Sequence, residues 1–179
     1  MSEQQKDAHE TWVSGAVAMM KQNVPARHIW DRLARLLGYA EITWLDGSVR
    51  DEQGRLSGQL VVFTEQHVAV VDLREELHSH QRGFAGPREG RSDVRIMARS
   101  SLLQIESLMD EDVPRQNSRH AWDRLGPRGE LQDAWPWDAP MVLVYPSMQV
   151  TVNGRVREAL DVDINMTDFM LTLLGDLAA

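Results

Sequence analysis

The chain has 179 residues, of which 42% are hydrophobic and 26% charged, and it is long enough to bury a core of its own. Its formal net charge of −8 disfavours nucleic acid and anionic membranes as partners, because an acidic chain gains nothing from phosphate attraction. The absence of cysteine excludes disulfides, thiol nucleophiles and thiolate metal sites. We find no signal peptide and no membrane span, so we expect a cytoplasmic protein without stable membrane association.

Two amphipathic helices are predicted at the start of the chain. Residues 1–9 are polar and are expected to fray, whereas residues 10–22 carry apolar side chains at three- and four-residue steps, as on one helix face. A second helix is predicted over residues 25–37. Asn23 is expected to cap it and Gly38 to end it.

Short strands dominate the next part of the chain. The strongest pattern is residues 58–72, where two β-branched-rich runs meet across Glu65-Gln66. Asn153-Gly154 has the composition of a two-residue hairpin turn. Residues 51–57 and 74–93 are predicted as loops. The remaining strand-like segments are residues 38–49, 94–100, 102–109, 141–145, 148–152 and 158–164.

The C-terminal segment, residues 167–179, is predicted as an amphipathic helix. Thr167 is its expected cap, because a threonine side chain accepts a hydrogen bond from the first helical turn. The side chains assigned to its buried side are Phe169, Leu173, Leu174 and Leu177. Together these elements predict an α+β chain, in which about seven antiparallel strands form a barrel or sandwich capped by the last helix.

A family resemblance supports this architecture. Gly58, Leu60 and Thr64 form a G-x-L-x-x-x-T pattern, the apolar strand HVAVVD follows, and residues 96–108 read IMARSSLLQIESL. On these features the chain resembles the bacterial pleckstrin-homology-like (PH-like) domains, and more loosely the GRAM domains, over about residues 40–177.

The resemblance implies a PH-like β domain over residues 39–179, preceded by a helical extension of residues 1–38. Residues 110–140 form a long loop that departs from the compact family pattern. Relatives that bind phosphoinositides cluster lysine and arginine in and beside the first hairpin. The corresponding segment here, DGSVRDEQGRLSG, sets Arg50 and Arg55 among three acids, which argues against phosphoinositide binding.

No motif for catalysis or for a metal is convincing. The pair His78-Ser-His80 lies in a predicted loop. His67 precedes it on a predicted strand, but no third ligand stands at a fixed spacing from the pair. Asp161-Val-Asp163-Ile-Asn165 imitates an EF-hand loop but lacks its sixth-position glycine and its final glutamate. There is no G-x-S-x-G elbow and no glycine-rich phosphate loop. We therefore predict a protein with no catalytic residues, no metal and no cofactor.

Tryptophan and arginine gather in the predicted long loop, which also holds four of the seven prolines. Both residue types often anchor protein interfaces. The predicted interaction residues in this loop are Trp122, Arg124, Arg128, Trp135 and Trp137. The alternative is that Trp135-Pro-Trp137 simply packs the loop onto the barrel.

Each N-terminal helix adds one tryptophan to the predicted interaction set, Trp12 and Trp30. Their apolar stripes must be buried, either by their own chain or by a second copy. The sequence thus favours a non-catalytic protein-interaction or regulatory module, with a protein partner or with self-association. The alternative is a small-ligand or lipid-headgroup binder that uses the open end of the barrel, and an enzyme comes third.

Overall fold

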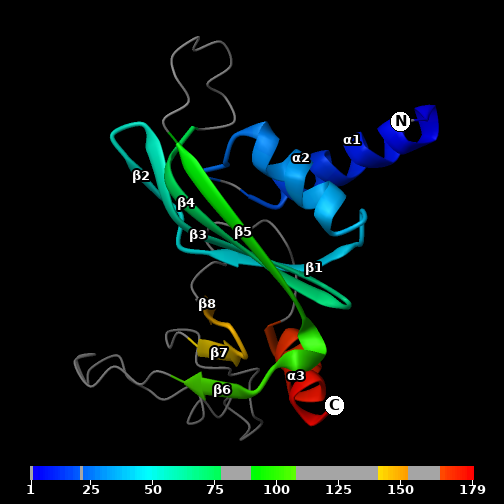
Figure 1. Ribbon diagram of the computed structural model, residues 1–179, viewed down its shortest axis with the longest axis vertical. Helices are drawn as coiled ribbons and strands as arrows, with labels where there is room; N and C mark the ends of the chain where they lie inside the picture. The colour runs from blue at the N-terminus through cyan, green and yellow to red at the C-terminus, as the bar shows by residue number, and fades with distance from the viewer. Residues whose placement is uncertain (1, 21, 78–89, 108–140, 153–165) are drawn as a thin grey trace, which may run out of the picture. The chain divides into compact units, whose positions relative to one another are not determined.

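The computed structural model describes residues 2–20, 22–77, 90–107, 141–152 and 166–179 (Figure 1). Within these ranges the chain is α+β, with three α-helices and two antiparallel sheets that do not close into a barrel. The described residues form two compact units: unit 1 contains those up to Arg99, and unit 2 contains those from Ser100 onward. Unit 1 thus includes the two N-terminal helices.

Unit 1 consists of two helices and an antiparallel sheet in the order β1-β3-β4-β5, with β2 also paired to β3. Its elements are α1 (Glu3–Ala18), α2 (Arg27–Leu36), β1 (Ile42–Gly47), β2 (Arg50–Glu52), β3 (Arg55–Thr64), β4 (His67–Glu76) and β5 (Arg91–Ala98). A short 3-10 turn, Arg99–Ser101, follows β5. β1 pairs with the second half of β3, and β2 pairs with its first half.

Helix α1 begins earlier than predicted. Ser2 Oγ accepts a hydrogen bond from the Gln5 N–H at 3.2 Å, and Gln5 Oε1 accepts one from the Ser2 N–H at 2.9 Å. This reciprocal capping box satisfies backbone donors at a helix start and stabilises the first turn. The prediction that residues 1–9 fray is therefore wrong from Glu3 onward.

The predicted C-terminal end of α2 is confirmed, whereas its predicted N-terminal cap is wrong. Gly38 has a φ of 61°, and bonds from Gly38 N–H to Arg35 O and from Tyr39 N–H to Ala34 O close the helix in a Schellman pattern. Asn23 does not cap the helix. Its Nδ2 donates to Val49 O at 2.9 Å instead, so it fixes the preceding loop.

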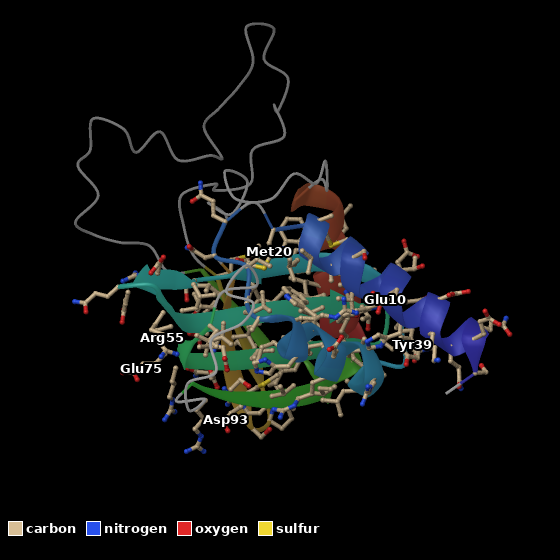
Figure 2. The ribbon with its side chains drawn as sticks, turned by 90° about the horizontal axis from the view of Figure 1, so that it is seen from above. Glu10, Met20, Tyr39, Arg55, Glu75 and Asp93 are labelled. Carbon is tan, nitrogen blue, oxygen red and sulfur yellow. The ribbon has the colours of Figure 1, made fainter. Side chains whose placement is uncertain are left out.

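The core of unit 1 lies between the two helices and one face of the sheet. Buried side chains from α1 and α2 pack there with alternate residues of β3 and β4, Leu60, Val62, Ala69 and Val71 among them. Figure 2 shows the helices with the sheet and its side chains. The apolar stripes of both helices are therefore largely buried by their own chain, whereas Leu36 of α2 is exposed.

The hairpin predicted at residues 58–72 is confirmed as β3 and β4, which pair antiparallel with Val61 opposite Val70. Side chains on the sheet face away from the helices are also fully buried, and these are Val61, Phe63, Val68 and Val70. A strand buried on both faces is apolar at successive positions rather than at alternate ones. That explains why these runs are almost uninterrupted.

A tight corner links β1, β2 and β3, where the sequence predicted a polar loop over residues 51–57. Gln53 and Gly54 both have positive φ, at 57° and 82°, which suits a two-residue hairpin turn between β2 and β3. Ser48 N–H donates to Gln59 O at 2.8 Å, so the backbones approach closely. A Cβ on Gly58 would lie 2.2 Å from Ser48 O, and its φ is 128°. Only glycine fits there.

Unit 2 contains a three-stranded antiparallel sheet, in the order β6-β7-β8, and the C-terminal helix. Its elements are β6 (Gln104–Ser107), β7 (Met141–Tyr145), β8 (Met148–Val152) and α3 (Met166–Ala178). The strands predicted at residues 141–145 and 148–152 are confirmed, and so is the C-terminal helix. The predicted loop at 110–140, the turn at 153–154 and the strand at 158–164 lie outside the described residues.

Candidate functional site

The predicted interaction residues fall into two groups. Trp122, Arg124, Arg128, Trp135 and Trp137 lie outside the described residues. Trp12 and Trp30 are buried in the core of unit 1, where their ring N–H groups donate to Ala40 O at 2.7 Å and Pro25 O at 3.2 Å. Neither of these two rings is presented at the surface.

A polar cluster joins α1 to α2. The buried His9 places Nε2 2.8 Å from Asp31 Oδ1, and its ring meets Tyr39 edge-on at 5.9 Å. Arg27 pairs with Glu10 and lies 3.5 Å from Asp31, and the hydrogen bond to Glu10 raises the pKa of Arg27. The His9 contacts and the Arg27–Glu10 pair hold α1 to α2 or to the turn after it, and the Arg27–Asp31 pair lies within α2. We therefore assign the cluster a structural role.

A second titratable pair joins α2 to the end of β4. The buried Glu76 accepts a hydrogen bond from Leu77 N–H at 3.0 Å, and its Oε2 lies 3.5 Å from Nε2 of the half-exposed His28. A carboxylate that orients a histidine recurs in general-base catalysis. Here Ala26 N–H also bonds Leu77 O at 2.8 Å, so the pair lies at a packed junction between α2 and β4.

Within the described residues, no group of three or more histidine or acidic side chains is arranged so that it could hold a metal ion. His67 lies at the start of β4, and its N–H donates to Thr64 Oγ1 at 3.0 Å. His78 and His80 lie outside the described residues, as does the EF-hand-like segment at 161–165.

In phosphoinositide-binding relatives the basic residues gather in and beside the first hairpin. Most charged residues of the corresponding segment in this chain lie on the β2–β3 hairpin. Glu52 is paired with Arg55 in the strand register. Arg55 also donates to Glu75 O at 3.4 Å, and Figure 2 shows these two residues at the same end of the sheet. Asp51 accepts from Gly54 N–H at 2.7 Å. Both signs of charge are therefore mixed along this hairpin and do not build a basic patch.

Helix α3 presents apolar side chains to solvent. Leu171 is 62% exposed, Leu174 50% and Leu177 39%, and we call these three residues the α3 leucine face. At roughly 100° per residue, Leu171 and Leu174 lie on the side of the helix opposite Phe169 and Leu173, which are both buried. Leu177 lies nearer the buried side, about 40° around the helix from Leu173. Single surface leucines are common, but two neighbouring exposed leucines on the side opposite the buried one indicate a candidate interaction site.

The leucine face lies on an acidic part of the chain. Residues 158–179 contain five acids and neither lysine nor arginine, and two of the acids, Asp168 and Asp176, belong to α3. The chain as a whole carries a formal charge of −8. The sequence around α3 is therefore acidic.

The sequence interpretation missed this face, because it placed Leu174 and Leu177 on the buried side of the helix. That assignment is wrong: both side chains are exposed, and only Phe169 and Leu173 are buried as predicted. The signal was present in the sequence. A helix with leucines at 171, 173, 174 and 177 is apolar around more than one stripe, so one buried side cannot accommodate them all.

Comparison with models of known protein families gives no match, and no curated protein sequence matches the chain significantly. Among the described helices, none combines the length and apolar character needed to cross a membrane.

Proposed function

We propose that the chain is a non-catalytic protein-interaction module on a PH-like scaffold, and that the α3 leucine face is a contact surface. The observation that carries the proposal is the exposure of Leu171, Leu174 and Leu177 on a helix that is already anchored by other side chains. An apolar patch of this kind gains free energy when a partner removes it from water, by about 25 cal/mol per Å² of apolar area.

The strand order supports the PH-like scaffold. β1 and β2 pair with successive halves of the same strand, β3, so they correspond to one strand bent at Gly47 and Ser48. When β1 and β2 are counted as one strand, the described strands number seven. They form two antiparallel sheets, and a C-terminal helix follows them. This is the element order that the sequence resemblance implies. The two N-terminal helices are an addition to it.

The separation of buried and exposed side chains on α3 supports an interaction role. Phe169 and Leu173 are buried and hold the helix in place, so the exposed leucines are not needed for that purpose. A helix fixed on one side and apolar on the other offers a preorganised surface, and preorganisation lowers the cost of binding. By contrast, the His28–Glu76 pair and the His9 cluster connect elements within unit 1.

Site-specific photo-crosslinking tests the proposal. A photoreactive amino acid replaces Leu171 in one variant and Leu103 in another, because Leu103 is 61% exposed but lies before β6 rather than on α3. We expect position 171 to give a discrete protein adduct in cells and position 103 to give none. Adding Leu174→Ser should reduce the adduct at position 171.

Two outcomes would contradict the proposal. Identical adducts at positions 171 and 103 would show that the leucine face has no selectivity. Adducts to lipid alone would favour a lipid-binding function instead.

A further inference from the structure

We propose that the outer edge of β5 binds an extended segment of another protein, with an acidic side chain opposite Arg32 and an apolar side chain two residues away from it. The segment adds one strand to the sheet of unit 1. This inference goes beyond the proposed function, because it names a second surface with its own ligand. All the residues that carry it belong to unit 1 and none to α3.

Strand β5 offers an unbroken edge. Among the described residues it is the outer strand of its sheet, and it pairs with β4 in one register from His67 opposite Ala98 to Arg74 opposite Arg91, without a bulge. Every second residue of an edge strand turns its N–H and C=O away from the sheet, where they can pair with another strand. Residues 91–96 of β5 therefore suit strand addition, in which main-chain hydrogen bonds hold an extended peptide.

Helix α2 lies beside this edge. Figure 2 shows α2 between α1 and the green strand β5, and the contacts agree: Asp31 meets His9 of α1, whereas Arg32 donates to Ser92 O at 3.4 Å. At about 100° per residue, Leu36 lies on the same side of α2 as Arg32. Both side chains are exposed, Leu36 by 54%. An exposed cation and an exposed leucine thus stand beside the edge of β5.

The order of these contacts sets the sequence pattern of the ligand. His28 lies near Glu76 at the end of β4, and Arg32, one turn later, contacts Ser92 near the start of β5, so α2 runs in the direction of β5. One further turn places Leu36 about 6 Å along, which equals about two residues of a strand. Alternate residues of a strand share a face, so an acid and an apolar residue two positions apart can both face α2.

The charge beside the edge favours an acidic side chain in the ligand. Arg32 and Arg35 are exposed on α2, and among the described residues neither has a carboxylate within ion-pair distance. The nearby acids Asp31 and Asp93 are each paired within unit 1. A carboxylate on the ligand would meet an arginine that can bind it through two parallel hydrogen bonds. A peptide N–H can then replace the long bond from Arg32 to Ser92 O.

The same charge argues against a second copy of the chain as the occupant. Two chains that paired antiparallel through β5 would form one continuous sheet, with their α2 helices side by side on the same face. Arg32 and Arg35 of each helix would then approach those of the other. Like charges at close range destabilise such a contact. The occupant that fits best is therefore an acidic segment of a different protein.

Peptide binding tests the inference. The probe is a fluorescein-labelled peptide in which threonine alternates with one glutamate and one leucine, two residues apart, and the control peptide carries lysine in place of glutamate. Fluorescence anisotropy is measured on the full chain and on the Arg32→Glu, Leu36→Ser and Arg50→Glu variants. Arg50→Glu controls for net charge, because Arg50 is exposed on β2, which pairs with β3 and not with β5.

We expect the glutamate peptide to bind the parent and Arg50→Glu equally. It should bind Arg32→Glu and Leu36→Ser about tenfold more weakly or worse. The lysine peptide should prefer Arg32→Glu to the parent, because the charges are then exchanged. Equal binding of the glutamate peptide to the parent and Arg32→Glu would overturn the inference, and so would no binding to the parent.

N-methylated peptides separate strand addition from charge attraction. Alternate N–H groups of an extended peptide face opposite edges, so only one alternate set can donate to β5. We expect methylation of one set to abolish binding and methylation of the other set to leave it unchanged. Equal effects of the two sets would contradict strand addition.

A second copy and a folding defect are each tested directly. If the parent forms a dimer in analytical ultracentrifugation and Leu36→Ser does not, the occupant of the edge is a second copy and the inference fails. Circular dichroism is the folding control. We expect unchanged spectra, because Arg32, Leu36 and Arg50 are all exposed.

The inference and the proposed function can fail separately. The Leu171→Ser/Leu174→Ser variant should bind the glutamate peptide as well as the parent does, and loss of binding in that variant would overturn the inference. Peptide binding without a protein adduct at position 171 would leave the β5 edge standing and remove the α3 contact surface. An adduct at position 171 without peptide binding would do the reverse.

Discussion

The N-terminal helices and the C-terminal helix use the same kind of apolar pattern in different ways. In α1 and α2 the large side chains of the stripes, Trp12 and Trp30 among them, are buried in the core of unit 1. In α3, Phe169 and Leu173 are buried, but Leu171 and Leu174 are exposed. An amphipathic pattern therefore identifies a helix, whereas its function depends on how much of the apolar surface the fold itself covers.

The comparison also separates structural from functional tryptophans. A tryptophan is a frequent interface anchor, but its ring is equally valuable in a core when its N–H finds a partner. Both tryptophans of α1 and α2 have such partners in backbone carbonyl groups. Their role in the described structure is to hold helices to the sheet, and the partner surface that we propose lies on α3.

The largest effect is expected for Trp30→Ala, which should lower the free energy of unfolding by about 3–5 kcal/mol. Trp30 is fully buried in unit 1, and its truncation removes a large ring and leaves a cavity. Urea unfolding followed by circular dichroism measures the change. Leu36→Ala on the same helix is the control, because Leu36 is exposed, and it should change stability by less than about 0.5 kcal/mol. Equal effects would show that the helix stripes are not the core of unit 1.

A matched pair on α3 tests the division between its buried and exposed sides. Leu173→Ala should cost about 2–4 kcal/mol, because its fully buried side chain leaves a cavity. Leu174→Ala should cost less than about 0.5 kcal/mol. Thermal and urea unfolding of both variants give the comparison. A similar cost for the two substitutions would mean that the leucine face is covered within the folded chain.

A smaller effect is expected at the corner that joins the first strands of unit 1. Gly58→Ala should destabilise the chain by about 1–3 kcal/mol, because alanine is strained at a φ of 128° and its Cβ would meet Ser48 O. Gly15→Ala is the matched control, since nothing lies within 4 Å of its added Cβ in α1. That substitution should stabilise the helix by about 0.5–1 kcal/mol. A neutral Gly58→Ala would show that the corner relaxes freely.

Local signals predicted much of the fold. β-branched runs beside a short polar break predict the strand pair at residues 58–72, and apolar runs predict the strands at 141–145 and 148–152; that the last two pair with each other is a finding of the structure. The start of α1 was missed because its capping box consists of Ser2 and Gln5 within a polar stretch that has no apolar period. The Gln53-Gly54 turn was read as part of a loop for the same reason: its strands are short and polar.

The candidate site was less predictable. Whether an apolar side chain is buried depends on what the rest of the chain places over it, and periodicity does not carry that information. Trp30 and Leu174 have equally good positions on their helical stripes, yet one is buried and the other is half-exposed. The excess of leucine around α3 was the one local sign that a single core-facing side would not be enough.

The most direct test of the α3 surface is hydrogen–deuterium exchange of the full chain with and without the protein partner that photo-crosslinking at position 171 identifies. We expect slower exchange over residues 166–178, because a docked partner stabilises α3 and covers its exposed leucines. We expect no change over residues 27–36, although α2 also carries an exposed leucine, Leu36. Protection centred on α2, or spread evenly over the chain, would contradict the claim that α3 is the contact surface.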